Sequence, residues 1–176
     1  MSVPTPEPSP ETLRDLNTHF AATGQVASSW AALEYMIDQA IWKLAGIEEK
    51  SGACLTAQFS SIHSRMRALI ALIELRGGNK GLIKEANIFS RDATPVALNR
   101  NRIVHSPLIL NTDMSEVQRI NIHADKSLLF EVKNSDIEHA KKTVNATGDL
   151  MIQFGALRQN IEDALLPSDD KSPPPA

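Results

Sequence analysis

The hexapeptide RNRIVH, residues 100–105, places four polar side chains around two apolar ones. Arginine carries a planar fork of N–H groups that pairs with phosphate oxygens, and histidine titrates near neutral pH, so it can accept or donate a proton. Asn101 lies four residues before His105, so on a helix the amide could orient the imidazole ring. The segment is therefore either a candidate site for handling phosphate or the polar end of an ordinary helix.

Four long segments with apolar residues at spacings of three and four must position this hexapeptide, because that spacing lines one face of a helix. The third of these segments ends in the hexapeptide itself, just before Pro107, which stops a helix. The four predicted helices cover residues 11–45, 56–76, 80–105 and 135–166.

Local signals refine these helices. Gly24 predicts a break between a short leading helix and the main part of the first one. Thr94 followed by Pro95 is typical of an N-cap and a first-turn proline, so the hexapeptide is expected on a fresh or kinked helical segment. Ser135 and Glu138 have the spacing of a capping box, which predicts the start of the last helix.

Residues 117–133 change period from helical spacing to alternation of apolar and polar residues. Two alternating runs flank the polar turn at 125–127, which indicates a β-hairpin. The fold class predicted from these patterns is mainly α, a four-helix bundle (up-down) with a small β-hairpin inserted between the third and fourth long helices. A hairpin alone is marginally stable, so it should pack against the bundle or against a partner subunit.

The two ends of the chain are rich in proline and polar residues and are expected to be disordered tails over 1–11 and 167–176. A single domain over 12–166 is expected between them, with the hairpin at about 117–133. The formal net charge is −3, and the tails carry the excess acid, so the body is neutral. A neutral body argues against a broad basic surface that binds nucleic acid without specificity.

Other features bear on where the chain is found. The N-terminal segment has no apolar run typical of a signal peptide, and the longest apolar run, ALIALI, is far shorter than the ~20 residues that cross a bilayer. Cys54 is the single cysteine, so an internal disulfide is excluded. We expect a cytoplasmic protein without a membrane segment.

A helical bundle whose third helix ends in Arg-Asn-x-x-x-His resembles the HEPN superfamily, which is found in many ribonuclease toxins and in RNA-processing or antiviral effectors. Arg100, Asn101 and His105 match the family pattern of an arginine, a polar residue and a histidine four to six residues after the arginine. Glu34 matches an acidic residue on the first helix in parts of the family. The resemblance covers about 26–166, and the hairpin departs from the minimal bundle.

The resemblance implies a metal-independent endoribonuclease that uses no cofactor. Such an enzyme could act as a toxin or as a stress or defence effector. In that reaction the ribose 2′-hydroxyl attacks the adjacent phosphorus. Arg100, Asn101 and His105 would be the catalytic residues, with Arg102 and Glu34 as phosphate- or RNA-binding or supporting residues. The alternative is a non-catalytic HEPN-like dimeric scaffold or nucleotide-binding module, working with a nucleotidyltransferase-type antitoxin partner.

Helix geometry raises a difficulty for the catalytic reading. Residues five apart are separated by about 140° around an ideal helix, so Arg100 and His105 should not share a face unless the helix end before Pro107 is distorted. One solution is a homodimer in which both copies line one cleft, an arrangement that the resemblance also implies.

The competing structural reading pairs Arg100 with Glu34 or Asp38 and lets His105 cap the helix end. On the second helix, His63, Arg65 and Arg67 could supply a face that contacts phosphate, but a solvated face is the expected reading. The other histidines lack metal-ligand spacing, so no metal site is expected.

Overall fold

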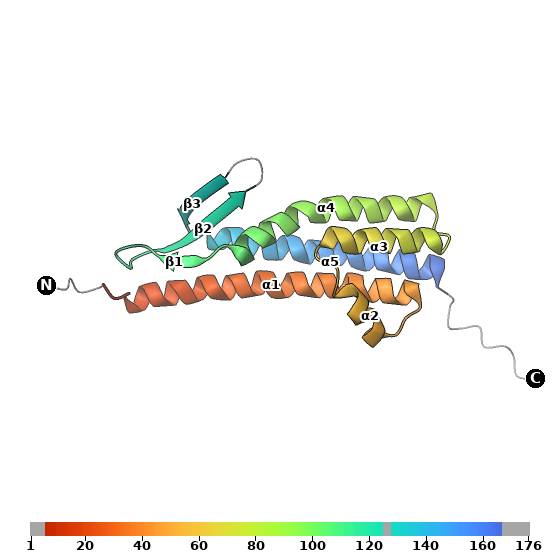
Figure 1. Cartoon of the computed structure of the whole chain (residues 1–176), viewed down its shortest axis with the longest axis horizontal. Helices are drawn as coiled ribbons and strands as arrows, with labels where there is room; N and C mark the ends of the chain where they lie inside the picture. The colour runs from red at the N-terminus through yellow and green to blue at the C-terminus, as the bar shows by residue number, and fades with distance from the viewer. Residues whose placement is uncertain (1–5, 125–127, 167–176) are drawn as a thin grey trace, which may run out of the picture. The chain divides into compact units, whose positions relative to one another are not determined.

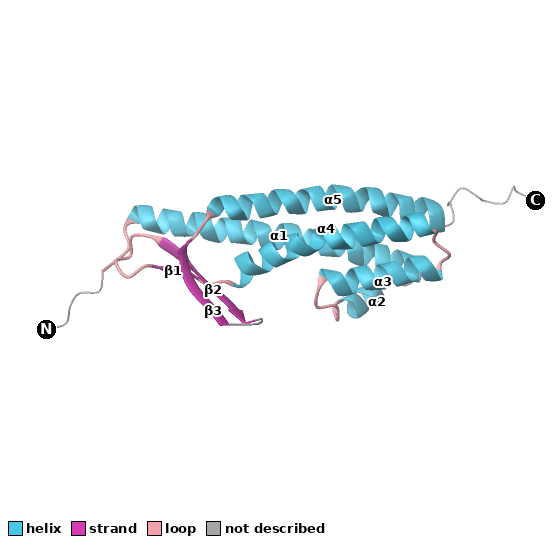
Figure 2. Cartoon of the chain, turned by 90° about the horizontal axis from the view of Figure 1, so that it is seen from above, coloured by secondary structure: helices cyan, strands magenta, loops and turns pink. Residues whose placement is uncertain are grey.

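The computed structural model of the chain describes residues 6–124 and 128–166 and is mainly helical, as the sequence predicts (Figures 1 and 2). Over these residues it has five helices and one small antiparallel sheet. The helices are α1 Pro10–Ala45, α2 Glu49–Thr56, α3 Ile62–Leu75, α4 Lys80–His105 and α5 Ile137–Leu165; the strands are β1 Leu108–Leu110, β2 Val117–Ala124 and β3 Leu128–Asn134.

The chain divides into two compact units, and three of the helices contribute residues to both. Unit 1 contains the described residues up to Trp30 together with Leu98–Ala146, so it holds the hexapeptide, the sheet and the start of α5. Unit 2 contains Ala31–Ala97 and the described residues from Thr147 onward. The expectation of one domain over 12–166 stays a prediction.

Unit 2 has a core of apolar side chains from α1, α3, α4 and α5. The helical spacing predicted most of these positions, because residues three and four apart lie on one face. Phe89 of α4 and Phe154 of α5 are fully buried, with ring centroids 5.2 Å apart. The largest fully buried side chains of this core are Leu33, Ile37, Leu44, Met66, Leu69, Ile73, Phe89, Phe154 and Ile161.

Unit 1 contains the sheet, in the order β1-β2-β3 with antiparallel neighbours. The predicted hairpin is confirmed as β2 and β3, whereas its predicted turn at 125–127 lies outside the described residues. The three-residue strand β1 was not predicted, because so short a run after Pro107 has no recognisable period. A small cluster of Val26, Ile103 and Ala140 is buried in this unit, and Ile103 belongs to the hexapeptide.

The first helix corrects two predictions. Helix α1 runs without interruption through Gly24, because one exposed glycine costs a helix only about 1 kcal/mol. The helix also begins at Pro10, inside the predicted tail, where the Ser9 hydroxyl accepts a hydrogen bond from the Thr12 N–H at 3.1 Å. The other residues of the predicted tails at 1–5 and 167–176 lie outside the described residues.

The helix predicted over 56–76 corresponds to α3, which begins later than predicted, and the short helix α2 before it was not predicted. Helix α2 ends at Thr56, and α3 begins at Ile62, after a capping box formed by Ser61 and Ser64. The Ser61 side chain accepts from the Ser64 N–H at 3.1 Å, so the chain has a fixed helix start where the apolar spacing alone suggested continuity.

Two further helix starts differ from the predictions. Helix α4 is continuous through Pro95, and the Thr94 hydroxyl donates to the Ser90 carbonyl at 2.9 Å instead of capping a new helix. The alternative of a kink at this position stays a prediction. Helix α5 is capped by Asp136, whose carboxylate accepts from the N–H groups of Glu138 and His139, so the predicted box of Ser135 and Glu138 is wrong. An aspartate accepts well at an N-cap because the first backbone N–H groups of a helix have no other partner.

None of the helices within the described residues combines the length and the apolar character needed to span a membrane.

Candidate functional site

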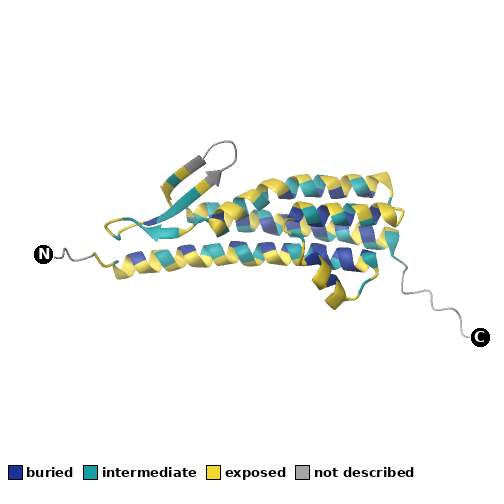
Figure 3. Ribbon diagram, in the orientation of Figure 1, coloured by how far each residue is buried: buried dark blue, intermediate teal, exposed yellow. Residues whose placement is uncertain are grey.

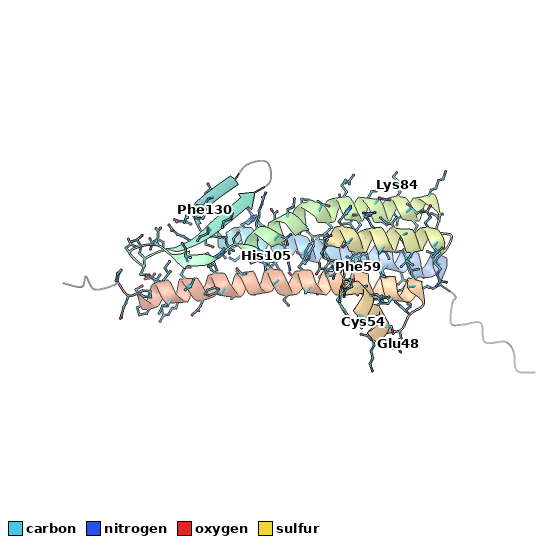
Figure 4. The ribbon with its side chains drawn as sticks, viewed as in Figure 1. Glu48, Cys54, Phe59, Lys84, His105 and Phe130 are labelled. Atoms are coloured by element: carbon cyan, nitrogen blue, oxygen red, sulfur yellow. The ribbon has the colours of Figure 1, made fainter. Side chains whose placement is uncertain are left out.

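Arg100 and His105 lie in contact at the end of α4 within one chain. Nη1 of Arg100 is 3.3 Å from Nε2 of His105, and Figure 4 labels His105 at this helix end. The predicted separation of the two residues around the helix therefore does not keep their side chains apart. The 140° separation applies to the Cα–Cβ directions, whereas a long arginine side chain can cross the end of a helix that no further turn covers.

The contact gives the two side chains different roles. An arginine N–H can only donate, so Nε2 of His105 is the acceptor in this contact. His105 is exposed and Arg100 is half-buried. The arrangement therefore offers a proton acceptor directly beside a fixed positive charge, on a side of the helix that solvent can reach.

Asn101 bonds to the arginine instead of the histidine. Its Oδ1 accepts a hydrogen bond of 2.8 Å from Nη1 of Arg100. The contacts of Asn101 therefore do not support its predicted role of orienting the imidazole ring. Nε of Arg100 is buried without a hydrogen-bond partner in the described residues, which leaves one donor of the guanidinium unused.

Arg119 of β2 supports the same helix end, and the sequence analysis missed it. Its Nη1 donates to the carbonyl oxygens of Ile103 and Ser106, the latter at 3.1 Å, and its Nη2 donates to Oγ1 of Thr23 at 3.3 Å. The last carbonyls of a helix have no partner within the helix, so this guanidinium satisfies groups on both sides of His105. Loss of solvent around the half-buried side chain lowers the pKa of Arg119.

A signal for Arg119 exists in the alternation of β2. Residues two apart in a strand point to the same face, so Arg119 shares a face with Val117, which is buried. The alternation of apolar and polar residues predicted the hairpin without indicating which of its faces is buried. Ile122, Phe130 and Val132 are exposed, and the register of β2 and β3 puts them on one face, the apolar sheet face. Figure 3 colours parts of both strands as exposed.

Glu34, a predicted supporting residue, lies in unit 2 and is bound to Arg65. Nη1 of Arg65 is 3.4 Å from Glu34, and Nε of Arg65 is 2.9 Å from Asp38. The expectation that α3 presents Arg65 on a solvated face is wrong, because Arg65 is buried. Both carboxylates that the competing reading assigned to Arg100 are paired with Arg65.

Arg102, the other predicted supporting residue, is exposed and lines a cavity in unit 1. The structure therefore brings together Arg100, Asn101 and His105, and it places Arg102 on the same helix end. Within residues 6–124 and 128–166, no group of three or more His, Cys, Asp or Glu side chains is placed to hold a metal ion. The expectation of chemistry without metal or cofactor stays a prediction.

Comparison with known proteins found no matching protein-family model, curated protein or solved structure.

Proposed function

We propose that this protein is a HEPN-like, metal-independent endoribonuclease that acts through Arg100 and His105, with Asn101 in support. The observation that carries the proposal is the 3.3 Å contact between Nη1 of Arg100 and Nε2 of His105. RNA cleavage by its own 2′-hydroxyl needs a proton acceptor beside a cation for phosphate, and these two side chains meet that need within one chain.

The proposed reaction begins when a phosphate group of RNA takes over the guanidinium of Arg100. The nonbridging oxygens accept from the arginine fork, which frees the lone pair on Nε2 of His105. The imidazole then removes the proton of the ribose 2′-hydroxyl, and the 2′-oxygen forms a bond to phosphorus. The bond from phosphorus to the 5′-oxygen breaks, that oxygen takes up a proton, and the products are a 2′,3′-cyclic phosphate and a 5′-hydroxyl.

Asn101 helps by holding the arginine. Its Oδ1 accepts from the same Nη1 that touches His105, so it restrains the guanidinium at the position where phosphate would arrive. Restraining a group before the reaction lowers the entropy cost of reaching the transition state. Arg102 is proposed as a contact for RNA phosphate next to this site.

The finer fold proposed for the chain is an up-down four-helix bundle of α1, α3, α4 and α5, with the hairpin inserted between the last two. The continuous apolar faces of these helices support it, because each needs a partner surface. We also propose a cytoplasmic homodimer. Because Arg100 and His105 are in contact within one chain, the site itself does not require a second copy. The support for the dimer is the exposed apolar sheet face.

A second candidate function has an observation in its favour. The apolar sheet face of Ile122, Phe130 and Val132 would suit a protein partner. This favours a non-catalytic dimeric scaffold or nucleotide-binding module, with a nucleotidyltransferase-type antitoxin as one possible class of partner. Such a protein would bind without cleaving, so an RNA cleavage assay separates the two functions.

The test is cleavage of mixed RNA, in the presence of EDTA, by the wild type and by His105→Ala and Arg100→Ala. Loss of a proton-transfer group costs about 10²–10⁴ in rate, and loss of an electrostatic donor costs about 10²–10³. Both residues lie at a helix end, so circular dichroism should show an intact fold. The wild-type products should carry a 2′,3′-cyclic phosphate.

Matched controls are available in unit 2. His63 and Arg67 are exposed residues of α3, so His63→Ala and Arg67→Ala should keep full activity. Equal cleavage by the wild type and His105→Ala would move the activity away from this site. An absence of cleavage by all proteins would favour the scaffold.

A further inference from the structure

Unit 1 contains a cavity of about 380 Å³ beside the end of α4. Pockets for small molecules begin at about 300 Å³, so this volume suits a ligand of the size of a mononucleotide. Its walls come from the last turn of α4, from β2 and β3, and from the first residues of α5. All of these elements lie within unit 1.

Not all of the charged side chains that line the cavity have an ion-pair partner among the described residues. Glu131 and Lys133 line it and pair with each other at 2.9 Å. Asp136 also lines it, but its carboxylate accepts two backbone N–H groups as the cap of α5. Two arginines, Arg102 and Arg119, complete the charged lining, and neither forms an ion pair with another described residue. An unpaired positive charge therefore remains for an anion.

Arg119 is held in place before any ligand arrives. Its hydrogen bonds to Ile103, Ser106 and Thr23 fix the guanidinium beneath the cavity. These bonds use Nη1 and one N–H of Nη2, so the Nε–H and the second N–H of Nη2 have no hydrogen-bond partner among the described residues. A half-buried cation in this position binds an anion more strongly than a fully hydrated one, because less water screens the interaction.

Ser135 provides a second, independent observation. Its Oγ is buried and has no hydrogen-bond partner in the described part of the chain, although the residue lines the cavity. A buried hydroxyl without a partner is uncommon and costly. A ligand oxygen in the cavity would supply the missing bond once the Ser135 hydroxyl rotates toward it.

We propose that this cavity binds a phosphate-bearing nucleotide, with Arg102, Arg119 and Ser135 as the phosphate contacts. The inference rests on the proposed function and deepens it, because Arg102 lies at the same helix end as Arg100 and His105. Asn121 of the cavity wall also accepts a hydrogen bond from the Ser106 hydroxyl, next to His105, at 3.2 Å. Under that function the ligand is the RNA nucleotide next to the cleaved bond. The polar side chains of Asn121 and His139 would face its base or ribose.

The experiment is calorimetric titration of full-length His105→Ala, which cannot turn over RNA under the proposal, with three probes. These are inorganic phosphate, the four nucleoside 5′-monophosphates, and a short oligonucleotide whose 2′-hydroxyls are replaced by hydrogen. We expect the oligonucleotide to bind, and Arg102→Ala to weaken that binding at least 10-fold, as loss of a charge-assisted hydrogen bond does. Ser135→Ala should weaken it by a smaller factor.

Two features keep the test decisive. Arg102 is exposed and Arg67 on α3 is an exposed arginine outside the cavity, so Arg102→Ala should fold, and Arg67→Ala should bind like the parent. Stronger binding of free nucleotides than of the oligonucleotide would assign the cavity to a soluble nucleotide. Binding that Arg102→Ala and Ser135→Ala leave unchanged, or an absence of binding by every probe, would overturn the inference.

Failure of this inference and failure of the proposed function give different results. If the wild type cleaves RNA and Arg102→Ala cleaves and binds RNA normally, the proposed function stands and the cavity is not the nucleotide site. If the protein never cleaves RNA but binds nucleotides through Arg102, the cavity is a nucleotide site and the proposed nuclease function is refuted.

Discussion

Arg65 and Asp38 form an ion pair inside unit 2 whose side chains are only 11% and 12% exposed. Burial raises the pKa of Asp38, and the opposing attraction of Arg65 does not fully offset this loss of solvent. Arg65 also donates to the Phe59 carbonyl at 3.0 Å, in the connection between α2 and α3. One guanidinium thus neutralises a buried carboxylate and holds a loop.

Arg65→Met should therefore destabilise the protein by about 3–5 kcal/mol at pH 7, because it leaves the Asp38 carboxylate buried without its partner. The free energy of unfolding from urea titration measures this. The loss should shrink on acidification, since a folded-state pKa above the unfolded value of about 3.9 means that the folded protein binds the proton more tightly. The missing stability is thus regained below that value.

The control is Arg67→Met, an exposed arginine two residues further along α3. A surface substitution of this kind changes stability by about 0.5 kcal/mol or less. If both variants unfold at the same urea concentration, the ion pair has no net value for folding.

At the scale of elements, two glycines in helices have opposite roles. A Cβ on Gly52 of α2 would lie 2.4 Å from ring atoms of Trp42, whose Nε1 donates to Oγ1 of Thr56 at 3.2 Å. The absence of a side chain at Gly52 therefore lets α2 pack on α1. A Cβ on Gly24 would meet no atom within 4 Å.

Gly52→Ala should therefore lower the free energy of unfolding by about 1–3 kcal/mol through overpacking. Gly24→Ala should raise it by about 0.5–1 kcal/mol, because alanine favours a helix interior more than glycine does. Thermal or urea unfolding of both variants measures the two signs. A loss of stability in Gly24→Ala would mean that α1 is not a regular helix at this position.

The sequence predicted the helices wherever apolar spacing was long and regular, as in α5 and most of α1. It failed where short-range chemistry decides the structure. The Ser61–Ser64 capping box separates α2 from α3, and no apolar period signals such a cap. The single glycine and proline at Gly24 and Pro95 were overrated, because the packing of a long helix outweighs one weak residue.

The candidate site was predicted in its residues but not in its geometry. Arg100, Asn101 and His105 were found from their types, whereas the reach of the Arg100 side chain around the helix end could not be read from Cα positions. Arg119 was missed because the alternation of β2 predicted a strand without indicating which of its faces is buried. A polar residue that shares a strand face with a buried valine was the available signal.

At the scale of the whole molecule, the apolar sheet face is the feature that a single chain leaves unexplained. Phe130 is 63% exposed, and Ile122, which pairs with it in register, is 56% exposed. Figure 4 labels Phe130 on β3, and β3 is an edge strand of the sheet. An exposed edge with apolar side chains favours association with another chain.

We therefore predict that the protein is a homodimer at micromolar concentration and that Phe130→Asp makes it a monomer, because a carboxylate in the contact would lose its water without gaining a partner. Sedimentation velocity measures both states. Leu75→Asp is the matched control, since Leu75 is 78% exposed in unit 2 and lies away from the sheet in the sequence; this variant should remain a dimer. A wild-type monomer would refute the dimer. A monomeric Phe130→Asp that still cleaves RNA would show that Arg100 and His105 of one chain suffice, as their direct contact allows.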